Sequence, residues 1–252
     1  MKRTPMSISA VVFAAAVLIS FPTAAFSKGL KLQAGAGLGY EVPAGDYAGT
    51  TVDYYAGTKY GLSGGINFHA KGRVGAAGFQ LAAEIGYSSF SNSGNAEASG
   101  QGKVEISQKV LSVKIGPEYM INIPAVPLKP YLGANLALNT ITGQTTFTGV
   151  ASVPSGTFDV KSATRFGLGI GGGLVYKMGP LMSLDLSLSY NLINLFGKKY
   201  VVTDPTNPGR IDSYVQLNDD KDPVAVDGSD HIIGASRSIS TMQAGLSLMF
   251  GI

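Results

Sequence analysis

Apolar and polar residues alternate at every second position through most of the chain after residue 27. The segment 182–191 shows the pattern most clearly, because Met, Leu and Tyr occupy its even positions and Ser, Asp and Asn its odd positions. Successive side chains of a β-strand point to opposite faces, so this period predicts strands with one apolar and one polar face. The predicted strands are 30–40, 60–69, 79–88, 110–120, 130–139, 164–177, 182–191 and 240–252.

The connections between these strands alternate between short and long. The short ones are 70–78, 121–129 and 178–181, and the long ones are 41–59, 89–109, 140–163 and 192–239. Short turns at one end and long loops at the other are typical of outer-membrane barrels, whereas a soluble sandwich has no reason to gather its long loops at one end. We therefore predict an all-β fold, a closed eight-stranded antiparallel up-and-down transmembrane β-barrel. A soluble secreted β-sandwich is the alternative.

Aromatic residues on the apolar face fall near the strand ends and form two bands. With the first strand running outward, the outer band is Tyr40, Tyr60, Tyr87, Phe166 and Tyr190, and the inner band is Phe68, Phe79, Tyr119, Tyr176 and Phe250. Aromatic rings concentrate at the two interfaces of a bilayer, so the bands are predicted to be girdles in contact with lipid. In a sandwich the same rings would belong to the core.

The polar face carries ionisable residues of both signs, which a barrel would enclose in its lumen. The predicted lumen network is Lys31, Lys114, Arg165 and Lys177 with Glu84, Glu118 and Asp185. Eight strands leave an interior that side chains can fill, so one hypothesis is a plug of ion pairs. The alternative is a narrow pore, helped by the inward glycines at 167, 169, 171 and 173. Those glycines would also relieve crowding where a small barrel bends tightly.

The first 27 residues resemble a signal peptide. Lys2 and Arg3 precede an apolar stretch at 8–21, and small residues follow it. An N-terminal anchor helix is the alternative. The predicted domains are therefore a signal peptide at 1–27 and a barrel domain at 28–252. Cleavage would change the balance from 19 basic and 16 acidic residues to 17 and 16, so nothing supports nucleic acid as a partner.

Composition excludes several kinds of site. The chain has no cysteine, which excludes disulfides, Cys-ligated zinc, iron–sulfur clusters and thiol catalysis. No cofactor is expected. Its two histidines are His69, predicted to face the lumen, and His231, in the last long loop. No serine lies two residues from His69 or two residues after His231, although a triad formed in space with Ser229 or Ser236 stays open. We expect a non-enzymatic protein.

The signal peptide, the strand pattern and the loop pattern together resemble the small outer-membrane β-barrel family, which includes the OmpA transmembrane domain and OmpX. The stretches that carry the resemblance are Gly35-Ala-Gly-Leu-Gly-Tyr40, Gly116-Pro-Glu-Tyr119, Leu128-Lys-Pro-Tyr-Leu-Gly133 and Leu184-Asp-Leu-Ser-Leu-Ser-Tyr190. The resemblance implies a multi-pass protein of the Gram-negative outer membrane with periplasmic termini. It also implies contact with outer-membrane lipids and lipopolysaccharide, and insertion by the barrel-assembly machinery, which would recognise Phe250 near the chain end.

The long loops are the remaining candidates for function. A structural or adhesion-like role through them, with an extracellular protein or glycan as ligand, is the leading hypothesis. A narrow pore and a lipid-modifying enzyme or protease are the alternatives. Exposed tyrosines would supply the contact surface, namely Tyr47, Tyr54, Tyr55, Tyr200 and Tyr214. The acidic runs 219–222 and 227–230 suggest calcium or, more simply, solvated turns. The segment 145–161 is predicted to form a hairpin beyond the membrane.

Overall fold

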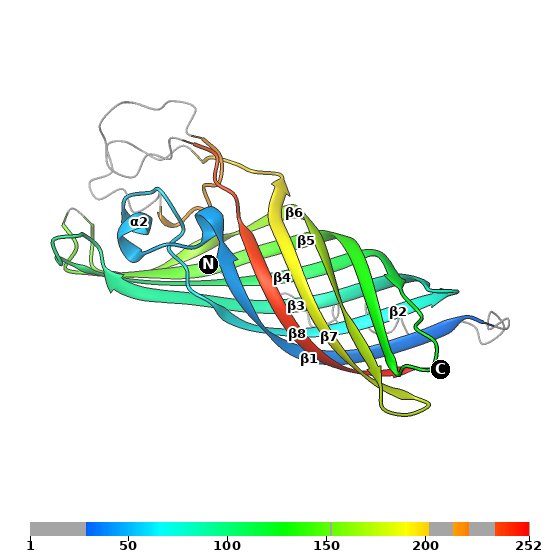
Figure 1. The fold of residues 1–252 in the computed structure, drawn as a ribbon. Helices are drawn as coiled ribbons and strands as arrows, with labels where there is room; N and C mark the ends of the chain where they lie inside the picture. Colours follow the sequence, from blue (N-terminus) through cyan, green and yellow to red (C-terminus); the bar gives the residue numbers. More distant parts are fainter. Residues whose placement is uncertain (1–28, 152, 202–213, 222–234, 252) are drawn as a thin grey trace, which may run out of the picture. The chain divides into compact units, whose positions relative to one another are not determined.

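A closed barrel of eight antiparallel strands makes up the fold (Figure 1). The computed structural model describes residues 29–151, 153–201, 214–221 and 235–251, so the predicted signal peptide lies outside the described residues. Two units are distinguished, Met1–Leu30 and Lys31–Ile252, and the second contains the barrel. The strands are β1 (Lys31–Ala44), β2 (Gly65–Ala76), β3 (Phe79–Asn95), β4 (Lys103–Met120), β5 (Leu128–Thr148), β6 (Gly156–Lys177), β7 (Met182–Phe196) and β8 (Ser240–Gly251).

Closure comes from the pairing of the first strand with the last. The register of β1 on β8 runs from Gln33 opposite Gly251 to Ala44 opposite Ser240. Because every strand then has a neighbour on both sides, the barrel presents no open edge along this length. In the part of the chain that the structure describes, no helix has both the length and the apolar character of a helical membrane span.

The two ends of the barrel differ. At the turn end, a two-residue connection, Ala77-Gly78, joins β2 to β3, and both residues have positive φ, 52° and 91°. A tight hairpin of this kind needs positive φ at both central positions, which Gly adopts without strain. The connections 121–127 and 178–181 also lie at the turn end. The opposite end carries the long connections and is called the loop end.

The second strand differs from the prediction of 60–69. It runs from Gly65 to Ala76, and its alternation continues through residues that are too small to mark an apolar face in the sequence. Ala70 and Gly72 occupy its outward positions, between the inward Lys71 and Arg73. Tyr60 precedes the strand altogether, and so it has no place on the barrel wall.

Between the turn end and the middle of the long strands, the outer surface is an apolar girdle. Its exposed large side chains include Phe79, Leu81, Val113, Ile115, Leu132, Leu136, Ile170, Leu174, Leu186, Leu188, Leu246 and Phe250. Ion pairs and hydrogen bonds occupy the inward face of the same strands. The outer face of such a sheet can contact the hydrocarbon of a membrane, while its inner face lines an enclosed polar lumen.

The amphipathic pattern reverses where β3, β4, β5 and β6 continue past the girdle. In β3, Tyr87 points outward and Ser88 inward, but two residues later the buried inward residue is Phe90, 0% exposed, and Ser89 points outward. In β5, Leu138 points outward and Asn139 inward, after which Ile141 is fully buried. The strands keep their register through this change of phase on β3 and β4. Their inner face therefore meets an apolar core, and their outer face meets water.

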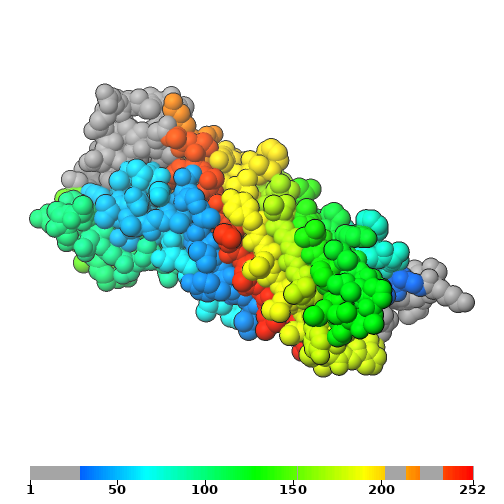
Figure 2. Space-filling model, viewed as in Figure 1, coloured from blue at the N-terminus to red at the C-terminus, as the bar shows by residue number. Residues whose placement is uncertain are grey.

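These extensions form a projecting sheet that packs on a small hydrophobic core at the loop end. The core joins the sheet to the 3₁₀ helix η2 (Gly45–Tyr47), to α2 (Thr51–Tyr55) and to the segment 214–217. Its buried members include Tyr47, Tyr54, Leu62, Phe90, Val104, Ile106, Ile141, Phe147, Tyr214 and Ile239. Figure 2 shows η2 and α2, in blue, lying against the projecting sheet, in green and cyan.

The reversal also explains why the predicted strand ends were wrong in this region. The strands 79–88, 110–120, 130–139 and 164–177 were predicted to stop or start where the alternation changes phase. The strands continue there, and β3–β4 and β4–β5 keep their register, whereas the β5–β6 pairing shifts register between Ile141 and Gly143. What changes the side-chain pattern is the environment on each side of the sheet. The hairpin predicted at 145–161 is confirmed, since Thr146 of β5 pairs with Thr157 of β6.

One strand allows the girdle to be tested against the projecting sheet. Leu136 and Gln144 both point outward from β5, but Leu136 lies in the apolar girdle and Gln144 beyond it. We expect Leu136→Arg to lower the free energy of unfolding by about 2–4 kcal/mol in lipid vesicles, the cost of a cation on a lipid-facing position. Gln144→Arg should change it by less than about 0.5 kcal/mol. Denaturant titration measures both, and equal costs would contradict the assigned boundary.

Candidate functional site

Nine of the ten aromatic residues predicted for the girdles project outward and are exposed. These are Tyr40, Phe68, Phe79, Tyr87, Tyr119, Phe166, Tyr176, Tyr190 and Phe250. Tyr60 is the exception, being 3% exposed within the loop-end core. Phe68 was predicted for the inner band, but it lies near the loop end of β2 and pairs with Tyr87. The earlier start assumed for the second strand caused both errors.

A four-charge cluster, Lys71, Arg73, Glu118 and Asp185, crosses the lumen toward the turn end, a few residues from the ends of β2 and β4 and from the start of β7. Arg73 from β2 bridges the two carboxylates, with Nε 2.5 Å from Glu118 Oε2 and Nη2 2.7 Å from Asp185 Oδ2. Lys71 Nζ lies 2.6 Å from Glu118 Oε1 and 3.6 Å from Asp185 Oδ2. The cluster is neutral as a whole and joins β2, β4 and β7 across the barrel.

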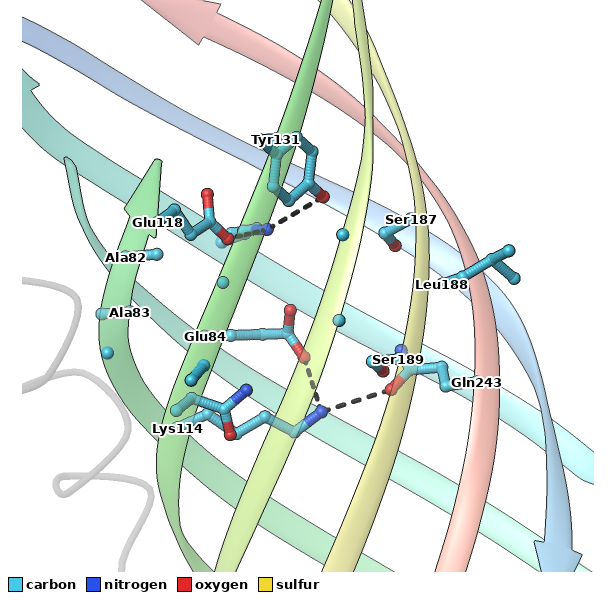
Figure 3. Close-up of a pocket in the computed structure, with 17 residues that line it drawn as sticks. Ala82, Ala83, Glu84, Lys114, Glu118, Tyr131, Ser187, Leu188, Ser189 and Gln243 are labelled. Carbon is cyan, nitrogen blue, oxygen red and sulfur yellow. Dashed lines mark hydrogen bonds and ion pairs between the residues drawn. The ribbon is translucent and has the colours of Figure 1, made fainter. Parts of the chain in front are cut away.

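Tyr131 from β5 completes this layer. Its hydroxyl donates a hydrogen bond to Asp185 Oδ1 over 2.9 Å, and the Arg73 guanidinium lies 4.5 Å from the centre of its ring. The same hydroxyl accepts a hydrogen bond from Lys71 Nζ over 3.5 Å, and Figure 3 shows Tyr131 and Glu118 together in the lumen. The ion pairs and the tyrosine hydroxyl offset much of the cost of burying these charges, and Arg73 Nη1 is left buried without a hydrogen-bond partner. The cluster and the tyrosine together therefore obstruct the lumen at this level.

A second charged layer lies next to the four-charge cluster. Lys114 Nζ donates to Glu84 Oε1 over 3.0 Å and to Gln243 Oε1 over 3.2 Å, as Figure 3 shows. A cavity of about 60 Å³ separates the two layers. A space of this size, lined by polar groups, suits a few water molecules. It is far too small for a solute of the size that ligand pockets usually hold.

A third layer contains His69. Its Nδ1 lies 2.8 Å from Asn67 Oδ1 and its Nε2 lies 2.7 Å from Ser247 Oγ. Asn67 Oδ1 can only accept, so Nδ1 carries the proton and Nε2 accepts from the Ser247 hydroxyl. The sequence did not predict this Ser–His pair, because β2 and β8 meet only through their shared neighbour β1. Both residues are buried, His69 at 6% and Ser247 at 1% exposure.

The inward glycines of β6 make room for side chains. A Cβ at position 173 would lie 2.7 Å from the Tyr131 hydroxyl, and one at 169 would lie 2.7 Å from the Asn135 amide. The volume that these glycines leave is thus occupied by residues of the neighbouring strands β5 and β7. This arrangement matches the packing interpretation of these positions and removes the argument for a channel along β6.

The loop end is closed by a different set of contacts. Arg165 binds Asp219 through two parallel bonds, Nε to Oδ2 and Nη2 to Oδ1, each 2.7 Å. Asn194 donates to the same carboxylate over 2.9 Å, and the Arg237 guanidinium lies 4.1 Å above the Tyr60 ring. Burial raises the pKa of the Tyr60 hydroxyl, and burial raises that of Tyr54 to about 12, so both phenols stay neutral. This loop-end seal holds the segment 214–221 over the lumen.

The predicted lumen residues are therefore distributed over four places. Glu84 and Lys114 pair directly, and Glu118 and Asp185 meet through Lys71 and Arg73. Arg165 pairs with a loop carboxylate and belongs to the loop-end seal.

Lys31 and Lys177 lie apart from these pairs, at the turn end. Lys71 and Arg73 were missed, although their odd numbers continue the inward parity of His69. The alternation in the sequence could have identified both residues as inward-facing. They were missed because the strand was predicted to end at residue 69.

The acidic runs of the last loop are only partly described. Asp219 is buried and already bound by Arg165 and Asn194, so it is not a free ligand for a cation. Asp222, Asp227, Asp230, Ser229 and His231 lie outside the described residues. Within the described residues, no group of three metal-ligating side chains occurs.

The girdle, the closed sheet and the filled lumen define a small outer-membrane β-barrel. Residues 13–237 match the family described as "Outer membrane protein beta-barrel domain", and the chain belongs to that family. The protein is accordingly an outer-membrane protein of the Gram-negative type. The comparison with curated proteins returned no match.

Several solved structures are similar to this chain. Neisserial surface protein A is 16% identical, with a TM-score of 0.44, and the match covers 89% of this chain and 97% of that one. Ail, the attachment invasion locus protein of Yersinia pestis, is 12% identical, with a TM-score of 0.43 and coverage of 90% and 100%. The outer membrane protease OmpT of Escherichia coli is 8% identical, with a TM-score of 0.41 and coverage of 90% and 98%.

The four-charge cluster can be tested by removing one charge. Asp185→Ala leaves Arg73 without one of its two carboxylates, and we expect a loss of about 3–5 kcal/mol in the free energy of unfolding. The exposed pair Lys103–Glu105 is the control, because Glu105→Gln should cost less than about 1 kcal/mol. Denaturant titration in vesicles measures both variants.

A double variant separates lost pairing from lost packing. In Arg73→Met with Asp185→Leu, one cation and one anion are removed together, so Lys71 and Glu118 still balance one another. We expect this variant to be more stable than Asp185→Ala. If it is less stable, the cluster does not act through charge balance.

Proposed function

We propose that the protein is a non-enzymatic outer-membrane barrel with a structural or adhesion-like role, carried by the projecting sheet and the loops at its loop end. The observation that supports this most directly is the double closure of the lumen, by the four-charge cluster and by the loop-end seal. A barrel closed in this way has its free surface at its ends. We place the turn end and both termini in the periplasm and the loop end outside the cell.

The projecting sheet suits contact with other molecules because it is rigid. Its apolar core holds η2 and α2 in place, and the Thr50 hydroxyl and the Asp53 carboxylate cap α2 reciprocally. These hydrogen bonds from Thr50 lower the pKa of Asp53, so the cap stays charged at neutral pH. Little ordering would be needed when a ligand binds to such a surface, which favours affinity.

The outer face of the sheet is mainly polar. A shallow hollow of about 510 Å³ is lined by Ser91, Asn92, Ser93, Glu105, Ile106, Ser107, Gln144 and Thr146. Hydroxyl, amide and carboxylate groups in this density complement the hydroxyls of sugars. We propose lipopolysaccharide sugars and extracellular glycans or proteins as its partners. Membrane lipids would contact the apolar girdle, and the barrel-assembly machinery would read the strand that contains Phe250.

Two other functions remain as alternatives. A narrow pore would require the four-charge cluster to rearrange, because its side chains cross the lumen. An enzyme acting on lipids or peptides would use His69 with Ser247, which have the spacing of a nucleophile and its base. Two lumen cavities of about 60 and 10 Å³ are too small to admit such a substrate, and neither His69 nor Ser247 lines them.

Conductance recording separates the closed barrel from the pore. We expect the refolded full chain to give no ion steps in planar bilayers. A triple variant, Lys71→Ala, Arg73→Ala and Asp185→Ala, removes three of the four charged side chains of the cluster and serves as the comparison. Steady steps from the unaltered protein would contradict the closed-barrel proposal.

A binding assay tests the contact surface. Cells that display the protein should bind members of a glycan array, and Ser91→Arg with Gln144→Arg should reduce the signal at least about tenfold, a loss of 1.4 kcal/mol. Lys129→Gln, at the opposite end of the barrel, is the matched control and should leave the signal unchanged. Equal binding by both variants would remove the projecting sheet as the contact surface.

A further inference from the structure

The turn end of the barrel contains a funnel of about 570 Å³ that none of the preceding contacts uses. Three lysines from three strands line it: Lys31 from β1, Lys129 from β5 and Lys177 from β6. No aspartate or glutamate is among its lining residues. Its volume falls within the range of about 300–1,000 Å³ that is usual for small-molecule sites.

The three lysines differ from the other lumen cations of the described chain. Lys71, Arg73, Lys114 and Arg165 each have a carboxylate within ion-pair distance. Among the described residues, no ion pair includes Lys31, Lys129 or Lys177, and the three lysines line the same cavity. Like charges that share a partly enclosed space repel, and a bound anion would relieve that repulsion.

The wall of the funnel supplies groups of a second kind. Gln33 lines it, and the Oε1 atom of Gln33 is buried without a hydrogen-bond partner in the structure. A buried acceptor without a partner costs free energy, and a ligand hydroxyl would satisfy it. Met120 and Val175, both nearly fully buried, form an apolar part of the lining. Cations, one free acceptor and an apolar patch together select an anion that also carries hydroxyl and CH groups.

We propose that the turn-end funnel binds a phosphate-bearing polyol, with Lys31, Lys129 and Lys177 around the phosphate and Gln33 accepting a hydrogen bond from a hydroxyl. Lysine binds phosphate as a point charge, whereas planar bidentate recognition of carboxylates is the property of arginine, which this funnel lacks. The ligand group that fits this site is a glycerol phosphate. It is available from the headgroup of an anionic phospholipid or from a soluble phosphate ester.

Calorimetry on the refolded full chain in maltoside detergent, with glycerol 3-phosphate as the probe, tests the site. We expect saturable binding that weakens as salt is raised. Lys129→Gln should weaken it about three- to tenfold, in keeping with the loss of roughly one charge contact. Lys103→Gln removes an exposed lysine at the loop end and should have no effect. Absence of saturable binding, or equal binding by the two variants, would overturn the proposal.

A second variant tests the polyol part of the proposal. Gln33→Leu should weaken glycerol 3-phosphate binding and leave the binding of pyrophosphate, which has no polyol, unchanged. If both probes weaken equally, the assignment of Gln33 is wrong.

The source of the ligand is decided in nanodiscs. Competition with glycerol 3-phosphate by phosphatidylglycerol, but not by phosphatidylcholine, would assign the site to a lipid headgroup. Undiminished binding in both lipids would assign it to a soluble ester.

Discussion

Every backbone N–H and C=O group in the hydrocarbon layer must find its partner within the protein. The chain meets this requirement by pairing β1 with β8, which closes the sheet on itself. Closure with eight strands leaves an interior of side-chain dimensions, and that interior has to be filled. The ion layers, the inward glycines and the placement of Tyr131 all follow from this requirement. They are solutions to packing polar groups in a space too narrow for bulk water.

The charged layers differ in how their charges are balanced, and that difference carries functional meaning. In the four-charge cluster and in the Lys114–Glu84 layer, each cation has a carboxylate partner. At the turn end, three lysines face a funnel without any carboxylate. At the loop end, the carboxylate of Asp219 comes from a loop and not from the barrel wall. The charges of the paired layers are thus balanced by residues of the barrel strands alone. The three lysines of the funnel have no carboxylate partner, and the charge of Arg165 at the loop end is balanced by a carboxylate from outside the strands.

The projecting sheet shows that one continuous strand can serve two environments. The girdle part of β3 has apolar residues on its outer face and polar residues on its inner face. Beyond Ser88 the apolar residues lie on the inner face and the polar residues on the outer face. This change of faces does not alter the hydrogen bonds between the strand backbones, because these bonds depend on the strand register and not on the side chains. The exchange of faces therefore marks the membrane boundary along each long strand. It also provides a water-facing polar surface directly above the lipid.

The sequence alone determined the class of fold, the lipid-facing parity and most of the lumen charges, because these depend on a local period of two that each strand carries by itself. It also supplied Glu84, Lys114, Glu118 and Asp185 as inward residues. Only the tertiary structure decided which charges meet, because Arg73 and Asp185 come from distant strands whose heights in the barrel depend on register.

Tyr60 and the strand ends were misplaced for a related reason. A hydrophobic pattern reports which residues avoid water, but it does not report whether they avoid it in lipid or in a core. The loop-end core and the apolar girdle look alike along the chain, and only the folded arrangement separates them.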